Sequence, residues 1–109
     1  MITHIVQLQF KDSISPDRVQ EVCSHLVSLK DKCLHPTSQT PYIRSFRAGK
    51  QNSPEGINNG ITHVFVMEFE SEEDREYYLN KDPEHLSFVK GLGGVLEKVQ
   101  VVDFTNGVF

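Results

Sequence analysis

The chain of 109 residues has no tryptophan, two cysteines and no long apolar run. A membrane-spanning helix needs about 18 or more consecutive apolar residues, so the sequence predicts no membrane span. Eleven Lys and Arg stand against fifteen Asp and Glu, which gives a net charge of −4, and the basic residues are scattered along the chain. Recognition of phosphates depends on clustered cations, so we expect no nucleic-acid partner. The absence of tryptophan excludes no class of function.

The cysteines and the N-terminus favour a reducing compartment. Cys23 and Cys33 are ten residues apart, which on one straight helix corresponds to about 15 Å of rise, too far for a disulfide. The N-terminus begins with an alternating strand pattern in place of the charged and apolar regions of a secretory signal. We therefore expect two free thiols and a cytoplasmic protein.

Alternating patterns and helix-start residues divide the chain into strands and helices. Apolar residues alternate with mixed ones from Ile2 to Phe10, as in a strand with one apolar face. Ser15 and Pro16 form a helix start, and apolar residues at helical spacing follow, which predicts a helix over 16–34. The same reasoning predicts strands over 42–50, 61–70 and 96–104, a helix over 72–80, and a further helix capped by Asp82 that ends near Gly91.

This β-α-β-β-α-β order predicts an α+β fold of the ferredoxin-like type, a four-stranded antiparallel sheet with helices on one face. A chain of this length makes one domain, residues 1–109. Strands 2–10 and 61–70 are expected to be central neighbours that run parallel, with strand 96–104 beside the first and antiparallel to it. The helix-free face would expose apolar residues that a second copy must cover, which predicts a homodimer; they are Ile5, Ile43, Val64, Val66 and Val102.

Polar side chains are expected to converge between this sheet and its helices. His4 and His63 would lie close together near the starts of two strands, and Asp103 would lie near His4. The covering helices would add Tyr78 and His85. The apolar remainder of the expected pocket consists of Val6, Leu8, Leu26 and Val101.

An apolar cavity with a few converging polar groups is the usual form of a small-molecule site, so we expect a small-molecule ligand. There a neutral histidine can take a proton, and a tyrosine hydroxyl can orient a carbonyl or stabilise an enolate oxygen. The same histidines and tyrosines would also suit ordinary structural positions. His4, His63 and Asp103 have the residue types of a two-histidine, one-carboxylate metal site, but no local ligand motif supports one, so no metal is expected.

Four segments carry a family resemblance: Thr3 to Lys11, Gly60 to Ser71, Tyr78 to His85 and Val101 to Phe104. The resemblance, which covers nearly the whole chain, is to the stress-responsive A/B barrel domain family of the dimeric α/β-barrel superfamily. It implies a ferredoxin-like monomer and a homodimer whose two sheets form a barrel. One member is a polyketide cyclase that needs no cofactor. Its Tyr and Pro-x-His pattern implies His85 as a base and Tyr78 as its partner, with His4, His63 and Asp103 beside them. The interval from Tyr78 to Pro83 leaves Tyr77 as an alternative to Tyr78.

Three functions therefore remain open from the sequence. The first is a cofactor-independent, polyketide cyclase-like lyase that acts on an enolisable small molecule through His85 and Tyr78. The second is a non-catalytic, stress-responsive or ligand-binding dimer in which the same pocket is a carrier site or part of the core. The third is a cofactor-free monooxygenase of the same superfamily.

Overall fold

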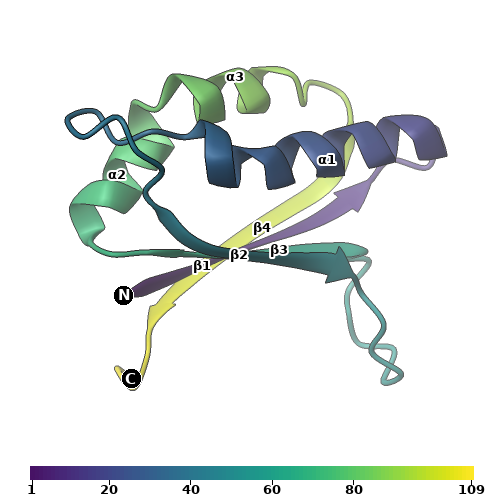
Figure 1. The fold of residues 1–109 in the computed structure, drawn as a ribbon. Helices are drawn as coiled ribbons and strands as arrows, with labels where there is room; N and C mark the ends of the chain where they lie inside the picture. Colours follow the sequence, from purple (N-terminus) through teal and green to yellow (C-terminus); the bar gives the residue numbers. More distant parts are fainter.

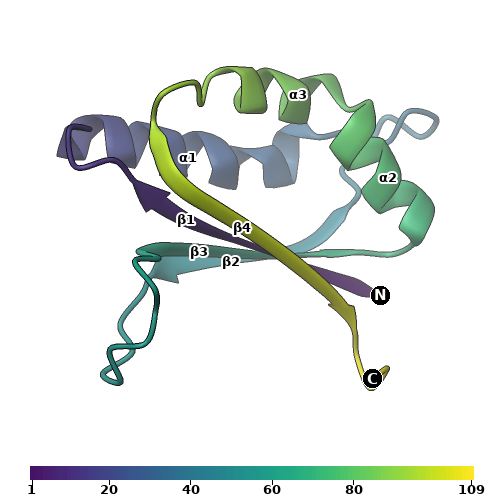
Figure 2. The same ribbon diagram turned by 180° about the vertical axis from the view of Figure 1, so that it is seen from behind.

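A computed structural model describes all residues from 1 to 109. The elements follow in this order: β1 (Ile2–Phe10), α1 (Pro16–Lys32), β2 (Ile43–Lys50), β3 (His63–Phe69), α2 (Glu72–Asn80), α3 (Pro83–Lys90) and β4 (Leu96–Thr105). The strands form one sheet in the order β2-β3-β1-β4, with every neighbouring pair antiparallel. All three helices lie on one face of this sheet (Figures 1 and 2). This confirms the predicted ferredoxin-like α+β fold.

The direction of β3 corrects one prediction from the sequence. β1 and β3 are central neighbours, as expected, but they are antiparallel, with His4 opposite Met67 and Leu8 opposite His63. The reason is topological, because the crossover through α1 makes β1 and β2 parallel, and β2 pairs antiparallel with β3 between them. The pairing of β1 with β4 is antiparallel as predicted and sets His4 opposite Asp103.

Each helix begins at a capping side chain. The Ser15 hydroxyl accepts a hydrogen bond from the Arg18 N–H at the start of α1. Asp82 caps α3 in the same way, and Pro83 follows at the first helical position, where a missing N–H costs nothing. α2 ends at Asn80 and α3 begins at Pro83, so only Lys81 and Asp82 separate the two helices. None of the helices is both long and apolar enough to cross a membrane.

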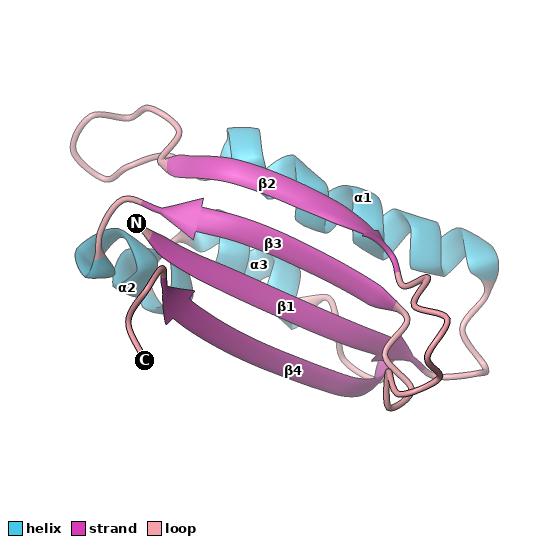
Figure 3. Cartoon of the chain, turned by 90° about the horizontal axis from the view of Figure 1, so that it is seen from below, coloured by secondary structure: helices cyan, strands magenta, loops and turns pink.

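The core lies between the helices and the sheet face that they cover. Its most deeply buried members include Leu29, Met67 and Phe69, which are fully shielded from solvent. Ile43 also lies in this core, which corrects its expected place on the helix-free face. A register shift between Ile43 and Ser45 turns the start of β2 and sets Ile43 opposite Phe69. The opposite face of the sheet has no cover within the chain (Figure 3).

Candidate functional site

A cavity of about 510 Å³ lies between the covered face of the sheet and the helices α1, α2 and α3, and we call it the His85 cavity. Eight of the nine site residues expected from the sequence line it: His4, Val6, Leu8, Leu26, Tyr78, His85, Val101 and Asp103. Five further residues, all apolar, complete the lining: Leu79, Phe88, Val89, Leu92 and Val99. Sequence reasoning placed Val99 on the same face as Val101 and Asp103 and missed the other four. Three of them follow His85 at intervals of three, four and seven residues, which is the spacing of one helix face and was a usable signal.

His4 is held at one side of this cavity by a carboxylate on the neighbouring strand. The Nδ1 atom of His4 lies 2.7 Å from Oδ1 of Asp103, because the β1–β4 register places the two residues opposite each other. The other oxygen of Asp103 accepts a hydrogen bond of 3.1 Å from Arg75. Since a carboxylate only accepts hydrogen bonds, Nδ1 of His4 carries the proton in this pair. The His4 ring is therefore fixed in orientation, and its Nε2 atom is not engaged by Asp103.

His85 stands against Tyr78 on the helical side of the cavity. The two rings are stacked, with centroids 4.0 Å apart and planes at 27°. The Nδ1 atom of His85 is buried and forms no hydrogen bond within the chain. Burial lowers the pKa of His85 below its ordinary value, an effect that the nearby backbone of Tyr78 partly offsets. At neutral pH the imidazole is thus mostly uncharged and able to accept a proton.

The ring of Tyr78 contacts the rings of both histidines of the cavity, His85 and His4. Its ring also meets the ring of His4 edge-on, at 6.1 Å between centroids. The residue is almost completely buried, and burial raises the pKa of its hydroxyl, so the phenol stays protonated across the physiological range. Tyr77, the alternative in the sequence, lines neither this cavity nor any other described below, and its ring packs against Tyr42.

A buried carboxylate beneath the cavity fixes the start of α3. Asp82 is 1% exposed and accepts two hydrogen bonds, one of 2.6 Å from the Tyr42 hydroxyl and one of 3.0 Å from the Glu84 N–H. His85 follows in the same first turn of α3. Asp82 and Tyr42 therefore determine where the imidazole of His85 stands, although neither lines the cavity.

His63 does not join this site. The antiparallel register sets it opposite Leu8, at the other end of β1 from His4, which makes the expected closeness of the two histidines wrong. Its Nδ1 atom pairs with the Thr62 hydroxyl at 2.8 Å, and its ring meets Phe10 edge-on. Consequently His4, His63 and Asp103 do not converge on one point, and the residue types that could suggest a metal site are not assembled.

Comparisons with known proteins agree with this geometry. The model of the stress-responsive A/B barrel domain matches residues 2–106, and the chain belongs to this family. A curated relative, the stress-response A/B barrel domain-containing protein HS1 of Arabidopsis thaliana, is 31% identical over 103 residues, covering 94% of this chain and 87% of the relative. Olivetolic acid cyclase of Cannabis sativa is 26% identical over 104 residues, covering 95% of each chain. The family resemblance expected from the sequence is confirmed.

Solved structures support the fold. Hydroxynitrile lyase from Passiflora edulis superposes with a TM-score of 0.83 at 22% identity, over 99% of this chain and 95% of the lyase. A dimeric ferredoxin-like protein of unknown function from Thermobifida fusca superposes with a TM-score of 0.73 at 21% identity, over 95% and 89% of the two chains. At identities this low, the superpositions establish a shared fold alone.

Proposed function

We propose that the protein is a cofactor-independent, polyketide cyclase-like lyase in which the His85 cavity binds an enolisable carbonyl compound. The observation that carries this proposal is the imidazole of His85, which is uncharged at neutral pH, has an unpaired buried nitrogen and lines a largely apolar cavity. In this mechanism His85 removes a proton from the carbon next to one carbonyl, the resulting carbanion attacks a second carbonyl of the same molecule, and the proton on His85 passes to the alkoxide that this attack forms.

The remaining polar groups would stabilise the enolate. The phenol of Tyr78 stays protonated, so it can donate a hydrogen bond to the substrate oxygen. Asp103 fixes His4, which would orient a polar group of the substrate through Nε2. His63, which was expected to share this role, lies outside the cavity and has no part in the proposed chemistry.

The lining restricts the substrate to uncharged compounds. Asp103 is the one Asp, Glu, Lys or Arg among the thirteen residues that line the cavity, and both of its oxygens already take part in hydrogen bonds. No Lys or Arg lines the cavity, so a substrate carboxylate would lose its hydration without gaining a cation. The volume of about 510 Å³ falls within the usual range for small-molecule sites. A neutral compound with two or more ketone groups and an alkyl or aryl chain fits these conditions.

The relatives leave two readings of the same cavity. Olivetolic acid cyclase is named for a cyclisation, which supports the catalytic reading, whereas the name of HS1 refers to stress. A non-catalytic, ligand-binding protein would use the same apolar lining without proton transfer. The combination of an uncharged His85 and a protonated Tyr78 in one cavity supports catalysis, because a carrier site needs neither a proton acceptor nor a proton donor.

The test is exchange of substrate protons with solvent. A neutral alkyl phenyl ketone is incubated with the protein in D₂O, and loss of the proton signal next to the carbonyl is followed by NMR. We expect the wild-type protein to accelerate exchange and His85→Asn to lower that acceleration by about 10²- to 10⁴-fold, the usual contribution of a general base. His63→Asn is the matched control, because His63 is also a half-buried histidine but lies at the other end of β1 from His4 and does not line the His85 cavity. Full exchange by His85→Asn would rule out His85 as the base, and binding without exchange in the wild type would favour the carrier.

We further propose that the protein is a homodimer formed through the helix-free face of the sheet. Val102 and Phe104 on this face are each nearly half exposed, at 46% and 48%, and Ile5, Val64 and Val66 extend the apolar surface across β1 and β3. The segment between β2 and β3 and the C-terminal tail both extend beyond this face of the sheet (Figure 1), where they could flank a second copy. The dimeric relative of the same fold supports this arrangement.

The free thiols Cys23 and Cys33 are consistent with the proposed cytoplasmic location.

A further inference from the structure

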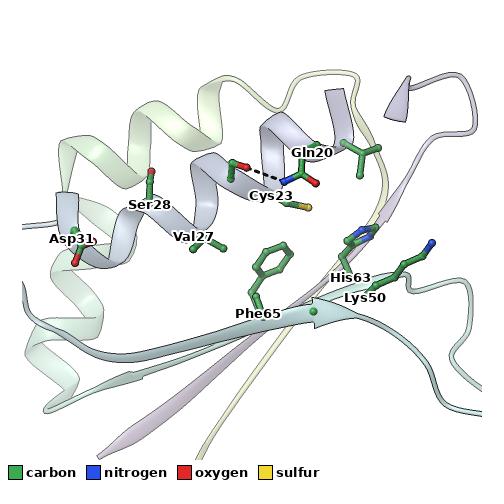
Figure 4. A pocket seen from close by; sticks show the side chains of 12 residues that line it. Gln20, Cys23, Val27, Ser28, Asp31, Lys50, His63 and Phe65 are labelled. Atoms are coloured by element: carbon green, nitrogen blue, oxygen red, sulfur yellow. Dashed lines mark hydrogen bonds between the residues drawn. The ribbon is translucent and has the colours of Figure 1, made fainter. Parts of the chain in front are cut away.

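A second, larger cavity lies on the other flank of α1. It has a volume of about 710 Å³ and extends between α1 and the strands β2 and β3 (Figure 4), and we call it the Lys50 groove. It shares no lining residue with the His85 cavity. Leu26 lines the His85 cavity, whereas Cys23 and Val27 line the Lys50 groove, so α1 separates the two spaces. The proposed reaction makes no use of the Lys50 groove.

Charged side chains stand at the two ends of the groove. Lys50, at the end of β2, and Asp31, near the end of α1, project at opposite ends in Figure 4. Neither residue takes part in an ion pair within the chain. From Gln20 to Asp31 the groove follows eleven residues of helix, which corresponds to about 16 Å. The groove therefore offers a free cation and a free carboxylate separated by the length of a small molecule.

The middle of the groove is apolar and uncharged. The ring of Phe65 lies on its floor, with Val27 above it on α1 (Figure 4). His63 stands beside Lys50, and burial, followed by the charge of Lys50, lowers the pKa of His63, so the imidazole adds no second cation. Burial raises the pKa of Cys23, so its thiol is a neutral wall atom and not an activated nucleophile. This lining suits reversible binding and offers no covalent chemistry.

We propose that the Lys50 groove is a second ligand site, for an amphipathic carboxylate with one anionic head and an aryl or alkyl body. The carboxylate would pair with Lys50, and the body would lie along Val27 and Cys23, above the buried ring of Phe65. Asp31 at the far end repels a second anion, so the site selects monoanions with an uncharged tail. This preference is the opposite of that of the His85 cavity, where no cation is available.

The experiment is an NMR titration of the ¹⁵N-labelled full chain with 4-phenylbutyrate and, separately, with the uncharged 4-phenylbutyramide. We expect 4-phenylbutyrate to shift the amide signals of Cys23, Val27 and Phe65 saturably, with at least tenfold weaker binding of the amide. Lys50→Gln should weaken binding of the acid about tenfold. Lys90→Gln is the matched control, because this lysine lies at the end of α3 and lines neither cavity. The affinity of Lys90→Gln for 4-phenylbutyrate should equal that of the wild type.

A blocking variant gives a second, independent readout. Val27 is 45% exposed on the groove side of α1, so Val27→Trp should fill the groove without disturbing the core and should abolish the shifts. Because the chain has no other tryptophan, its fluorescence also reports whether this variant is folded. The proposal is overturned if the shifts fall on residues of the His85 cavity, if acid and amide bind equally, or if Lys50→Gln and Lys90→Gln have the same affinity.

Discussion

Removing the carboxylate of Asp82 should destabilise the protein more than any exposed substitution, because this carboxylate joins three parts of the fold. It accepts a hydrogen bond from the hydroxyl of Tyr42, which precedes β2, and it caps α3 by accepting a hydrogen bond from the Glu84 N–H. It also lies close enough to Cys33, at the end of α1, to raise the pKa of that thiol in addition to the effect of burial. Asp82 and Tyr42 are both almost completely buried, so water cannot replace a lost partner.

The magnitude follows from the two hydrogen bonds. Loss of a helix N-cap costs about 1 kcal/mol, and loss of a buried hydrogen bond to a charged acceptor costs about 1.5–3 kcal/mol. Asp82→Ala should therefore lower the free energy of unfolding by about 2.5–4 kcal/mol. Tyr42→Phe removes the hydroxyl and leaves the cap, so it should cost about 1.5–3 kcal/mol.

Urea unfolding of the two single variants and of the double variant measures both costs and their coupling. Because the residues share one hydrogen bond, the double variant should be less destabilised than the sum of the single variants by about 0.5–3 kcal/mol. Tyr77→Phe is the control, since the Tyr77 hydroxyl forms no hydrogen bond in the chain while its ring packs in the same cluster. A cost below about 0.5 kcal/mol for Tyr42→Phe, together with no measurable coupling, would refute the assignment of this bond as a major stabilising contact.

Two further predictions concern pH and assembly. The pKa values of His63 and His85 are lowered in the folded protein by burial, so the unfolded chain binds more protons as the pH falls below about 6.5. The free energy of unfolding should therefore decrease below that pH, and the decrease should be smaller in His85→Asn than in the wild type. Urea unfolding of both proteins from pH 7.5 to 5 measures this decrease. An equal loss of stability in the wild type and in His85→Asn would contradict the prediction. Val102→Glu places a charge on the helix-free face and should shift the protein from dimer to monomer in sedimentation at micromolar concentration, whereas an unchanged dimer would exclude this face as the interface.

The local elements could be predicted from the sequence because their signals are local. Ser15 with Pro16, Ser71, and Asp82 with Pro83 each mark a helix start, and each forms the expected capping hydrogen bond. Alternation also placed His4 and Asp103 on the same face, because a strand period of two fixes the face once the pairing direction is right. The pairing of His4 with Asp103 could therefore be predicted from the alternation of the two strands, although 99 residues separate the two in the sequence.

The errors arose where the outcome depends on how distant segments pair. His63 was placed beside His4 because its strand was assigned the wrong direction, and reversing a strand moves a residue to the opposite end of its neighbour. Ile43 was placed on the wrong face because one irregularity in β2 shifts the alternation, and no turn residue marks it in the sequence. Neither error concerns a residue of β1 or β4. All expected site residues other than His63 therefore line the His85 cavity.

The two cavities owe their different chemistry to the two flanks of α1. The flank that faces the core carries the apolar residues Val22, Leu26 and Leu29, and it closes one side of the His85 cavity through Leu26. The other flank carries Gln20, Ser24 and Ser28 at intervals of four, and Gln20 donates to the Ser24 hydroxyl along the rim of the Lys50 groove. Since the sites lie on opposite flanks, Val27→Trp should block the Lys50 groove and leave ketone proton exchange at His85 unchanged. A parallel loss of both would instead mean that α1 moves as a unit and couples the two cavities.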